Sequence, residues 1–375
     1  MLKIAVFGTS KWSHIMRQLI ENEYSNLVAE QGGETIAVDA LVTLDDMAQE
    51  GEITVAEFGE RYREGSLSAI VIPKEYYIQQ NDLVFALIRE GVELEDIYDG
   101  MRLYEGIAQT PEALPGLLTP MMLDPYLPYL EFHVADHCNL NCKYCTHYSP
   151  LVQEPVFTDF EQFSKDLAQL RRYIVDIGIV RILGGEPLLN PQLGAYIEYV
   201  RSLYPASIIT VVTNGLLIPG LKDELVEIMK ACKAFFHISY YPPMEAKIGE
   251  IQKRLYELGV PYTITAQITE FNQTQTLAPR ADGEFFYQCF QATCTCLHQG
   301  KLAPCYAPFT TKYFNRAFQQ ELPVDEGIDL YAEELSAPMI KAGLLLPMER
   351  CRYCIDGAAR PWEIVGKHSS LEDWV

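Results

Sequence analysis

Cysteine is the residue type whose number and spacing could do chemistry in this 375-residue chain. Nine of the ten cysteines fall into three groups, and only Cys232 stands apart, where we expect a small buried apolar residue. The first residues lack the apolar run and cleavage site of a secretory signal, so we expect a cytoplasmic protein with reduced thiols. Metal binding or catalysis must then explain the groups, which are Cys138, Cys142 and Cys145; Cys289, Cys294, Cys296 and Cys305; and Cys351 and Cys354.

The first group occupies one loop, Cys138-Asn-Leu-Asn-Cys142-Lys-Tyr-Cys145, directly after an expected strand. Three thiolates can hold three irons of a cubane cluster and leave the fourth iron open to a small-molecule ligand. Structural zinc is the alternative, but a closed zinc site needs four protein ligands, and the usual two-plus-two spacing is absent. The loop therefore favours an open iron-sulfur cluster.

This loop resembles the signature of the radical S-adenosylmethionine (radical SAM) superfamily, Cys-x3-Cys-x-aromatic-Cys, at every position. The resemblance extends from about Leu127 to Thr265. It implies that Cys138, Cys142 and Cys145 ligate a 4Fe-4S cluster that binds S-adenosylmethionine. It also implies that Tyr144, in the aromatic place, packs by the adenine of that cofactor.

Further motifs follow the next expected strands. Gly184-Gly185-Glu186-Pro187 looks like the family's GGEP motif, in which glycines let backbone approach the ligand and the carboxylate takes the methionine amino group. A tight strand-to-helix turn is the alternative reading of the same residues. Asn214 closes the third strand, as similar loops do in this family, and Ser239 is a candidate for the cofactor ribose or carboxylate, although a polar core residue is an equally good reading of Ser239.

The resemblance implies the chemistry as well. A one-electron donor such as flavodoxin or ferredoxin would reduce the cluster, and reductive cleavage of S-adenosylmethionine would give methionine and a 5'-deoxyadenosyl radical. That radical would abstract a hydrogen atom from a substrate that these motifs do not identify.

The second and third groups give Cys289-x10-Gly-x4-Cys305 and, later, Cys351-x2-Cys354. Four cysteines in two pairs saturate a cubane cluster or a zinc ion. The pattern resembles the twitch domain, an abbreviated form of the SPASM domain, and so implies an auxiliary 4Fe-4S cluster. Cys294 and Cys296 leave two alternatives open: either replaces Cys289 as a ligand, or they are free thiols that return a hydrogen atom to a substrate radical.

The elements that must position these residues alternate between strand and helix, which predicts an α/β protein. Residues 1–107 read as a Rossmann-like parallel sheet. Its first turn, Gly8 to Ser13, offers amides for a phosphate or nucleotide, or simply turns the chain; one glycine in place of three disfavours conventional NAD binding. The expected strands are 3–7, 35–42, 69–72 and 94–98, and the expected helices are 12–23, 55–64 and 82–90.

Prolines between Thr110 and Pro128 predict a break in regular structure and a domain boundary. After it, βα units predict a partial (β/α)6 barrel with its chemistry at the carboxyl ends of the strands. The expected strands are 129–134, 179–183, 208–212, 235–239 and 262–265, and the helices are 160–173, 192–204, 221–232 and 246–258. We therefore expect a Rossmann-like domain (1–107), a Pro-rich linker (108–127), the radical SAM barrel (128–284) and a small iron-sulfur auxiliary domain (285–375).

Composition limits the partners. With 29 basic and 51 acidic residues the net charge is −22, and no basic cluster appears, so nucleic acid is an unfavourable partner. The 49% hydrophobic content excludes disorder, and no stretch approaches the ~20 apolar residues that cross a bilayer.

We accordingly expect an oxidoreductase or epimerase that acts on a small polar substrate of carbohydrate or nucleotide-sugar type. An auxiliary cluster suits dehydrogenation, because it can accept the electron left on the substrate radical. Two alternatives stay open: a maturase that modifies a ribosomally made peptide, and an activase whose N-terminal domain docks a partner protein.

Overall fold

The computed structural model describes residues 1–30, 32, 34–44, 48, 51–73, 80–100, 120–280, 284–365 and 369–375. The chain divides into two compact units, Met1–Pro128 and Tyr129–Val375, and each is described by itself. Much of the expected linker, and its Pro111 and Pro115, lies outside the described residues. Within the described ranges, no helix combines the length and the apolar character needed to cross a bilayer.

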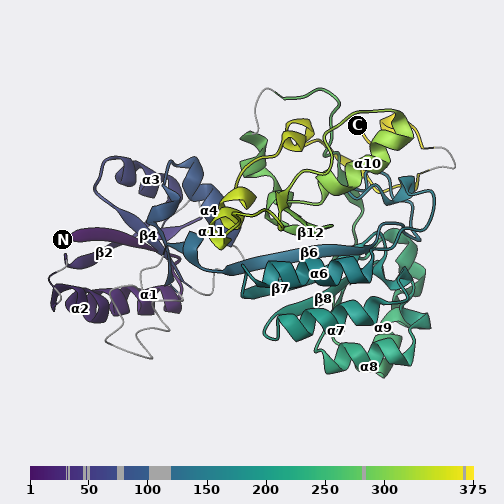
Figure 1. The fold of residues 1–375 in the computed structure, drawn as a ribbon, viewed down its shortest axis with the longest axis horizontal. Helices are drawn as coiled ribbons and strands as arrows, with labels where there is room; N and C mark the ends of the chain where they lie inside the picture. Colours follow the sequence, from purple (N-terminus) through teal and green to yellow (C-terminus); the bar gives the residue numbers. More distant parts are fainter. Residues whose placement is uncertain are drawn as a thin grey trace. The chain divides into compact units, whose positions relative to one another are not determined.

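The first unit is built on a five-stranded sheet of order β3-β2-β1-β4-β5, and every neighbouring pair in it is parallel. Figure 1 shows α1 and α2 on one face of this sheet and α3 and α4 on the other. This arrangement confirms the Rossmann-like expectation. The strands are β1 (Leu2–Phe7), β2 (Ile36–Thr43), β3 (Glu52–Thr54), β4 (Ala69–Ile72) and β5 (Ile97–Asp99), and the helices are α1 (Lys11–Gln18), α2 (Ser25–Glu30), α3 (Val55–Arg63) and α4 (Gln80–Arg89), with a π-helical turn, Leu19–Tyr24, between α1 and α2.

The turn after β1 closes on itself. Gly8 has φ of +86°, a conformation that glycine adopts without strain, and its N–H donates to the carbonyl of Val42. The Ser13 hydroxyl donates to the carbonyl of Phe7 at 3.0 Å. Both groups are used within the fold, and a phosphate or nucleotide site at this turn stays a prediction.

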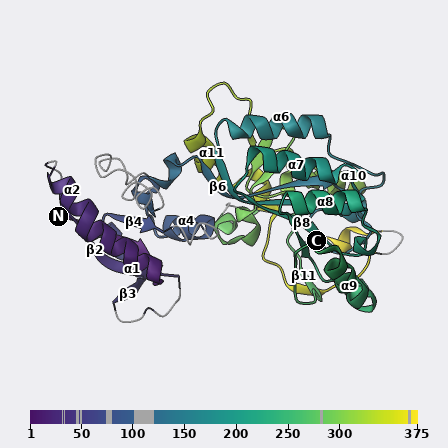
Figure 2. The same ribbon diagram turned by 90° about the horizontal axis from the view of Figure 1, so that it is seen from below.

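The second unit contains an eight-stranded sheet of order β10-β9-β8-β7-β6-β12-β13-β14. Its core is formed by apolar side chains that alternate along the expected barrel strands. In β7, for example, Val180 and Ile182 are fully buried. Figures 1 and 2 show α6, α7 and α8 side by side along this sheet. The barrel strands are β6 (Tyr126–Ala135), β7 (Asp176–Gly184), β8 (Ile208–Thr213), β9 (Phe235–Ile238) and β10 (Tyr262–Ile264), and the helices are α6 (Phe160–Arg171), α7 (Leu193–Leu203), α8 (Asp223–Ala231) and α9 (Ile248–Leu258).

The strands after the barrel join the same sheet instead of folding apart from it. The strand β12 runs parallel to β6, with Cys296 opposite Glu131, so it continues the barrel on the other side of β6. The remaining elements are β11 (Glu270–Asn272), which pairs with β15 (Ala359–Pro361), β12 (Cys296–His298), β13 (Lys301–Ala303), β14 (Ile328–Asp329), α10 (Ala307–Phe318) and α11 (Ala337–Leu344).

Three local expectations differ from the structure. The strand β3 was not expected, because three residues carry no readable period. Residues 94–96 form a 3-10 turn, so β5 begins only at Ile97. The strand β6 begins at Tyr126 despite Pro128, because proline is tolerated where a strand starts.

Candidate functional site

The cysteine loop lies between the end of β6 and α6. Burial raises the pKa of Cys138 and of Cys142 to about 12. Their sulfurs nevertheless accept hydrogen bonds from N–H groups: Leu140 N lies 3.4 Å and Asn214 Nδ2 3.7 Å from Cys138 Sγ. N–H donors directed at sulfur stabilise thiolates and metal-bound sulfur.

The loop opens into a cavity of ≈ 170 Å³ that we call the cluster cavity. All three cysteines of the loop line it, together with side chains and backbone from the ends of β7, β8 and β9. This meeting of strand ends agrees with the expected position of the chemistry at the carboxyl ends of the barrel strands. The lining residues that bear on the argument are Cys138, Cys142, Cys145, His147, Leu183, Gly184, Gly185, Val212, Asn214, Ser239 and Tyr241.

Gly184 and Gly185 are required by the protein backbone itself. A Cβ on Gly184 would lie 2.0 Å from the carbonyl oxygen of Ala135, and one on Gly185 would lie 2.3 Å from that of His137. Gly184 also has φ of +149°. The two glycines therefore let the end of β7 approach the segment that leads into the cysteine loop.

Glu186 turns into the protein. Its side chain is fully buried and accepts hydrogen bonds from Thr213 Oγ1 (2.7 Å), Asn214 N (2.9 Å) and Leu188 N (3.0 Å). Burial raises the pKa of Glu186 to about 7, although these three bonds act to lower it. Neither Glu186 nor Pro187, which is buried at the start of a 3-10 turn, is among the residues that line the cluster cavity. Glu186 organises the Thr213–Gly215 turn, and its contact with a cofactor amino group stays a prediction.

The other expected cofactor residues are divided. Asn214 and Ser239 line the cluster cavity, and the Asn214 amide donates to Asn139 Oδ1 at 2.6 Å. Tyr144 does not line it; this residue has φ of +56°, and its N–H donates to the carbonyl of Asp373 at 3.4 Å. The left-handed conformation of Tyr144 shapes the loop between the second and third cysteines.

The C-terminal segment contacts the cysteine loop, which sequence analysis did not foresee. Trp362 Nε1 donates to Cys142 Sγ at 3.3 Å, Lys143 N donates to the carbonyl of Glu363, and Val365 N donates to that of Asn141. A tryptophan near the end of the chain is a sequence signal for some buried contact, but the sequence does not indicate which residue it contacts.

The second set of cysteines also gathers. Cys289 and Cys354 line a separate cavity of ≈ 150 Å³. The pKa of Cys305 is raised first by burial and then by the charges of Cys354, Cys351 and, more weakly, Cys289. The same kind of effect links Cys296 to Cys305 and Cys294 to Cys289, so it places these thiols in one region without selecting four of them, and the ligand set chosen from spacing stays a prediction.

Arg350 lies beside these thiols. Its side chain is 2% exposed; Nη1 donates to Cys354 Sγ at 3.5 Å, and Nη2 donates to Gln275 Oε1 at 2.6 Å and to the hydroxyl of Tyr148. None of the ion pairs found in the described ranges includes this guanidinium. A buried cation without a carboxylate is costly, so its position suits an anionic thiolate or cluster at Cys354.

Cys294 and Cys296 occupy different places. Cys296 is fully buried, and its sulfur lies 3.0 Å from Glu131 Oε1 and 2.8 Å from the carbonyl oxygen of Cys294, either of which can accept its single S–H. Cys294 lines a third cavity, of ≈ 250 Å³, which we call the inner cavity. It is lined by Tyr129, Glu131, Thr146, His147, Arg181, Leu183, Val212, Phe290, Gln291, Cys294, Cys305, Tyr306 and Ala307.

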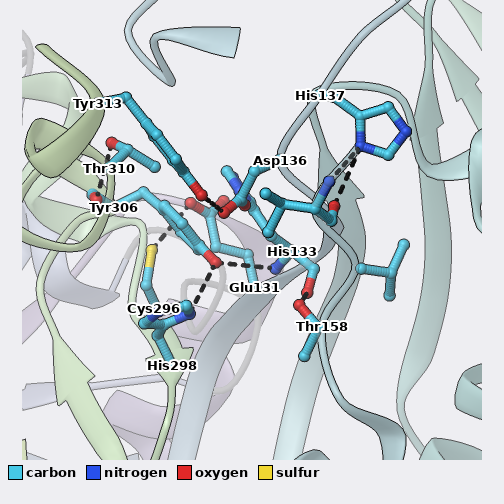
Figure 3. Close-up of polar contacts among 12 residues, drawn as sticks. Glu131, His133, Asp136, His137, Thr158, Cys296, His298, Tyr306, Thr310 and Tyr313 are labelled. Atoms are coloured by element: carbon cyan, nitrogen blue, oxygen red, sulfur yellow. Dashed lines mark hydrogen bonds and ion pairs between the residues drawn. The ribbon is translucent and has the colours of Figure 1, made fainter. Parts of the chain in front are cut away.

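A buried polar cluster holds β6 against α10 (Figure 3). His133 Nδ1 and Asp136 Oδ1 are 2.8 Å apart, and the hydroxyl of Tyr313 donates to the other oxygen of Asp136. The rings of His133 and Tyr306 stack with their centroids 3.3 Å apart. Burial lowers the pKa of His133, so the neutral ring donates its Nδ1–H to an ionised Asp136, whose pKa is lowered because the bonds from His133 and Tyr313 outweigh burial.

The residues of the cysteine loop fit the open cluster that their motif implies. Within the described ranges, no three His, Cys, Asp or Glu side chains are drawn together at metal-binding distance. The fit rests on the donor set: three thiols of one loop line one cavity, with N–H groups directed at two of their sulfurs. Three sulfur ligands with adjoining space match a cluster that keeps one open iron.

Comparison with known proteins places this site in a family. Residues 133–241 match the family model described as Radical SAM superfamily. The chain is similar to GTP 3',8-cyclase of Clostridium acetobutylicum, with 35% identity over 101 residues (26% of this chain, 31% of that protein), and to that of Syntrophomonas wolfei, with 32% identity over 118 residues (28% and 33%). The chain thus spans about a third of the length of the curated relatives it matches.

Similar solved structures include BtrN in complex with AdoMet and 2-DOIA (16% identity, 62% of this chain and 94% of that chain, TM-score 0.38) and anSMEcpe with bound AdoMet and a peptide (16% identity, 37% and 42%, TM-score 0.30). Because these TM-scores are low, the assignment rests on the family model and on the cysteine loop. Radical SAM domains use a 4Fe-4S cluster and S-adenosylmethionine. Residues 133–241, which carry the complete cysteine signature after the carboxyl end of β6, are a domain of the radical SAM superfamily.

Proposed function

We propose that this protein is a radical SAM enzyme that dehydrogenates or epimerises a small polar substrate of carbohydrate or nucleotide-sugar type. The observation that carries the proposal is that two cavities are neighbours: His147, Leu183 and Val212 line both the cluster cavity and the inner cavity. When bound at the three cysteines, a 4Fe-4S cluster with S-adenosylmethionine supplies a 5'-deoxyadenosyl radical that removes a hydrogen atom from a neighbouring substrate. A substrate in the inner cavity would be that neighbour.

The inner cavity favours a small molecule over a peptide. Its ≈ 250 Å³ lies below the roughly 300–1,000 Å³ of pockets for drug-sized ligands. Tyr129, Glu131 and Arg181 supply a hydroxyl, a carboxylate and a guanidinium to its wall. Several polar groups converging on a small cavity suit a molecule rich in hydroxyl groups.

An auxiliary cluster at Cys289, Cys305, Cys351 and Cys354 supports dehydrogenation. Cys305 itself lines the inner cavity, so these ligands lie next to the substrate's place. Loss of a hydrogen atom and then of a proton from a substrate alcohol leaves one electron, which the auxiliary site would accept. The buried Arg350 beside Cys354 favours a site that carries negative charge.

Epimerisation is the second candidate, and the position of Cys294 favours it. Cys294 lines the inner cavity, where its thiol could give a hydrogen atom to a substrate radical. Cys296 is not among the residues that line the inner cavity, so of the two thiols Cys294 is the hydrogen-atom donor we propose.

The relatives named GTP 3',8-cyclase support a small-molecule substrate as well, and the size of the inner cavity favours it over a peptide or a partner protein. A one-electron donor such as flavodoxin or ferredoxin, and a cytoplasmic location that keeps the thiols reduced, belong to the same proposal.

Two measurements test it. Anaerobically reconstituted protein should contain about eight irons, four for each of two cubane clusters, and should release 5'-deoxyadenosine from S-adenosylmethionine with dithionite. Changing Cys138, Cys142 and Cys145 together to Ala should remove one cluster and all 5'-deoxyadenosine, whereas Cys232→Ala should change neither. About four irons, or stoichiometric zinc, would reject the auxiliary cluster, and absent 5'-deoxyadenosine would reject radical SAM activity.

A further inference from the structure

Arg181 lies on β7 in the wall of the inner cavity, and its side chain makes no hydrogen bond or ion pair within the described ranges. Its guanidinium carbon lies 5.6 Å from the centroid of the Tyr129 ring, and its Nε is buried with no hydrogen-bond acceptor. None of the ion pairs found among the described residues includes it. The two terminal nitrogens of Arg181 also make no hydrogen bond within the described ranges, but unlike Nε they keep some solvent access, so they are the donors that a ligand in the cavity can reach.

The nearby carboxylate does not fill that role. Glu131 lines the same cavity, but its two oxygens have other donors beside them: Tyr129 OH bonds to Oε2 at 2.5 Å, and Cys296 Sγ lies 3.0 Å from Oε1. Burial raises the pKa of Glu131, and the charge of Arg181 only partly opposes this effect from a distance. The cavity thus holds a fixed cation whose hydrogen-bonding groups remain free to take a ligand.

We propose that the inner cavity binds a substrate with an anionic group, a carboxylate or a phosphate, that pairs with Arg181. A planar guanidinium binds either anion through two parallel hydrogen bonds, which fixes the orientation of the ligand as well as its position. The chain's net charge of −22 repels anions in general, so binding of an anion in this cavity needs a local cation such as Arg181. The inference rests on the proposed function and narrows its substrate class to hydroxylated molecules that carry an acidic group.

The test compares matched ligands on the anaerobically reconstituted protein with S-adenosylmethionine present. The probes are gluconate against sorbitol, which lacks the carboxylate, and glucose 6-phosphate against glucose, and binding is measured by calorimetry. At least one anionic probe should bind more tightly than its neutral counterpart, and the two pairs separate a carboxylate from a phosphate preference. Glucosamine, a cation, should not bind.

Two variants locate the effect. Arg181→Gln should weaken binding of the anionic probe about ten- to a hundredfold. Arg181→Lys keeps a point charge, so its affinity for the probe should lie between those of Arg181→Gln and wild type. Arg254→Gln is the matched control, because Arg254 Nε is also buried without an acceptor but lies on α9 outside the inner cavity.

Equal binding of anionic and neutral probes, binding of neither anion, or unchanged anion binding in Arg181→Gln overturns the inference. Measuring 5'-deoxyadenosine release in the same preparations keeps the two proposals apart. Release without an Arg181-dependent anion preference rejects the inference alone, whereas absence of release rejects the proposed function.

Discussion

The indole Nε1 of Trp362 donates a hydrogen bond to Sγ of Cys142, 3.3 Å away, although 220 residues of chain separate them. Two ion pairs reinforce this contact, because Lys143 Nζ lies 2.9 Å from Glu363 and 3.1 Å from Asp373. The end of the chain therefore forms part of the environment of the cysteine loop. A donor aimed at a ligand sulfur stabilises the reduced, more negative form of a cluster.

We expect Trp362→Phe to lower the reduction potential of the cluster at Cys138, Cys142 and Cys145. Loss of one hydrogen bond, about 0.5–1.5 kcal/mol, corresponds to roughly 20–65 mV for one electron. A redox titration followed by electron paramagnetic resonance measures the shift. Trp374→Phe is the control, since Trp374 Nε1 donates to Ser369 Oγ and not to a sulfur. Equal potentials in the two variants would contradict the role of Trp362.

Arg350 gives a corresponding prediction for the auxiliary site. Replacement by Met removes a buried positive charge next to Cys354, so the potential of the auxiliary cluster should fall and the melting temperature should drop. Arg352→Met, which removes an exposed arginine paired with Glu349, should change neither. An unaltered auxiliary signal in Arg350→Met would show that this guanidinium does not balance the cluster.

Glu186 should make the cluster-free protein lose stability as pH rises. Its pKa in the folded state, about 7, exceeds the ordinary value of 4.5, so between these values the folded protein binds more protons than the unfolded chain. The contribution of Glu186 to the free energy of unfolding is therefore fully present below pH 4.5 and is lost as pH approaches 7.

Denaturant titrations across this pH range should show a smaller decline for Glu186→Gln than for wild type. Glu227→Gln, at an exposed carboxylate that pairs with Lys230, should keep the wild-type slope. A slope that Glu186→Gln leaves unchanged would mean that Glu186 ionises as it does in the unfolded chain.

Tyr313→Phe should lower the free energy of unfolding by about 1.5–3 kcal/mol, the usual worth of a hydrogen bond to a charged group. The lost bond is the one to buried Asp136, which fixes α10 against the end of β6 (Figure 3). Tyr256→Phe provides the comparison, because Tyr256 is 87% exposed and its loss should cost almost nothing. Equal stabilities of the two variants would show that the polar cluster does not stabilise the packing of α10 against β6.

The sequence reveals those parts of the site that are contiguous in the chain. The cysteine loop could be read directly, and the barrel strands could be read from runs of apolar residues, because both signals lie within a few neighbouring residues. Glu186 shows what a motif does not reveal. The Gly-Gly-Glu-Pro motif identified the turn, but it did not indicate that the carboxylate of Glu186 points into the protein.

The contacts that sequence analysis missed join residues that look ordinary in their local sequence. Glu131 and Arg181 lie on different strands, and Trp362 lies far from Cys142 in the chain. Only the fold brings each pair to one cavity or loop, and no spacing in a single sequence encodes that meeting. The same reason explains why Cys294 and Cys296 could not be distinguished before their burial was known.

The pairing of β12 with β6 limits how this protein can be divided. Glu131 N donates to the carbonyl of Thr295 at 2.8 Å, so the segment that carries the auxiliary cysteines covers one edge of β6. A truncation after residue 284 would leave the backbone N–H and C=O groups of that edge open to pairing with other chains, and we expect it to aggregate. Engineers who wish to exchange auxiliary modules between such enzymes would have to transplant β6 together with the module.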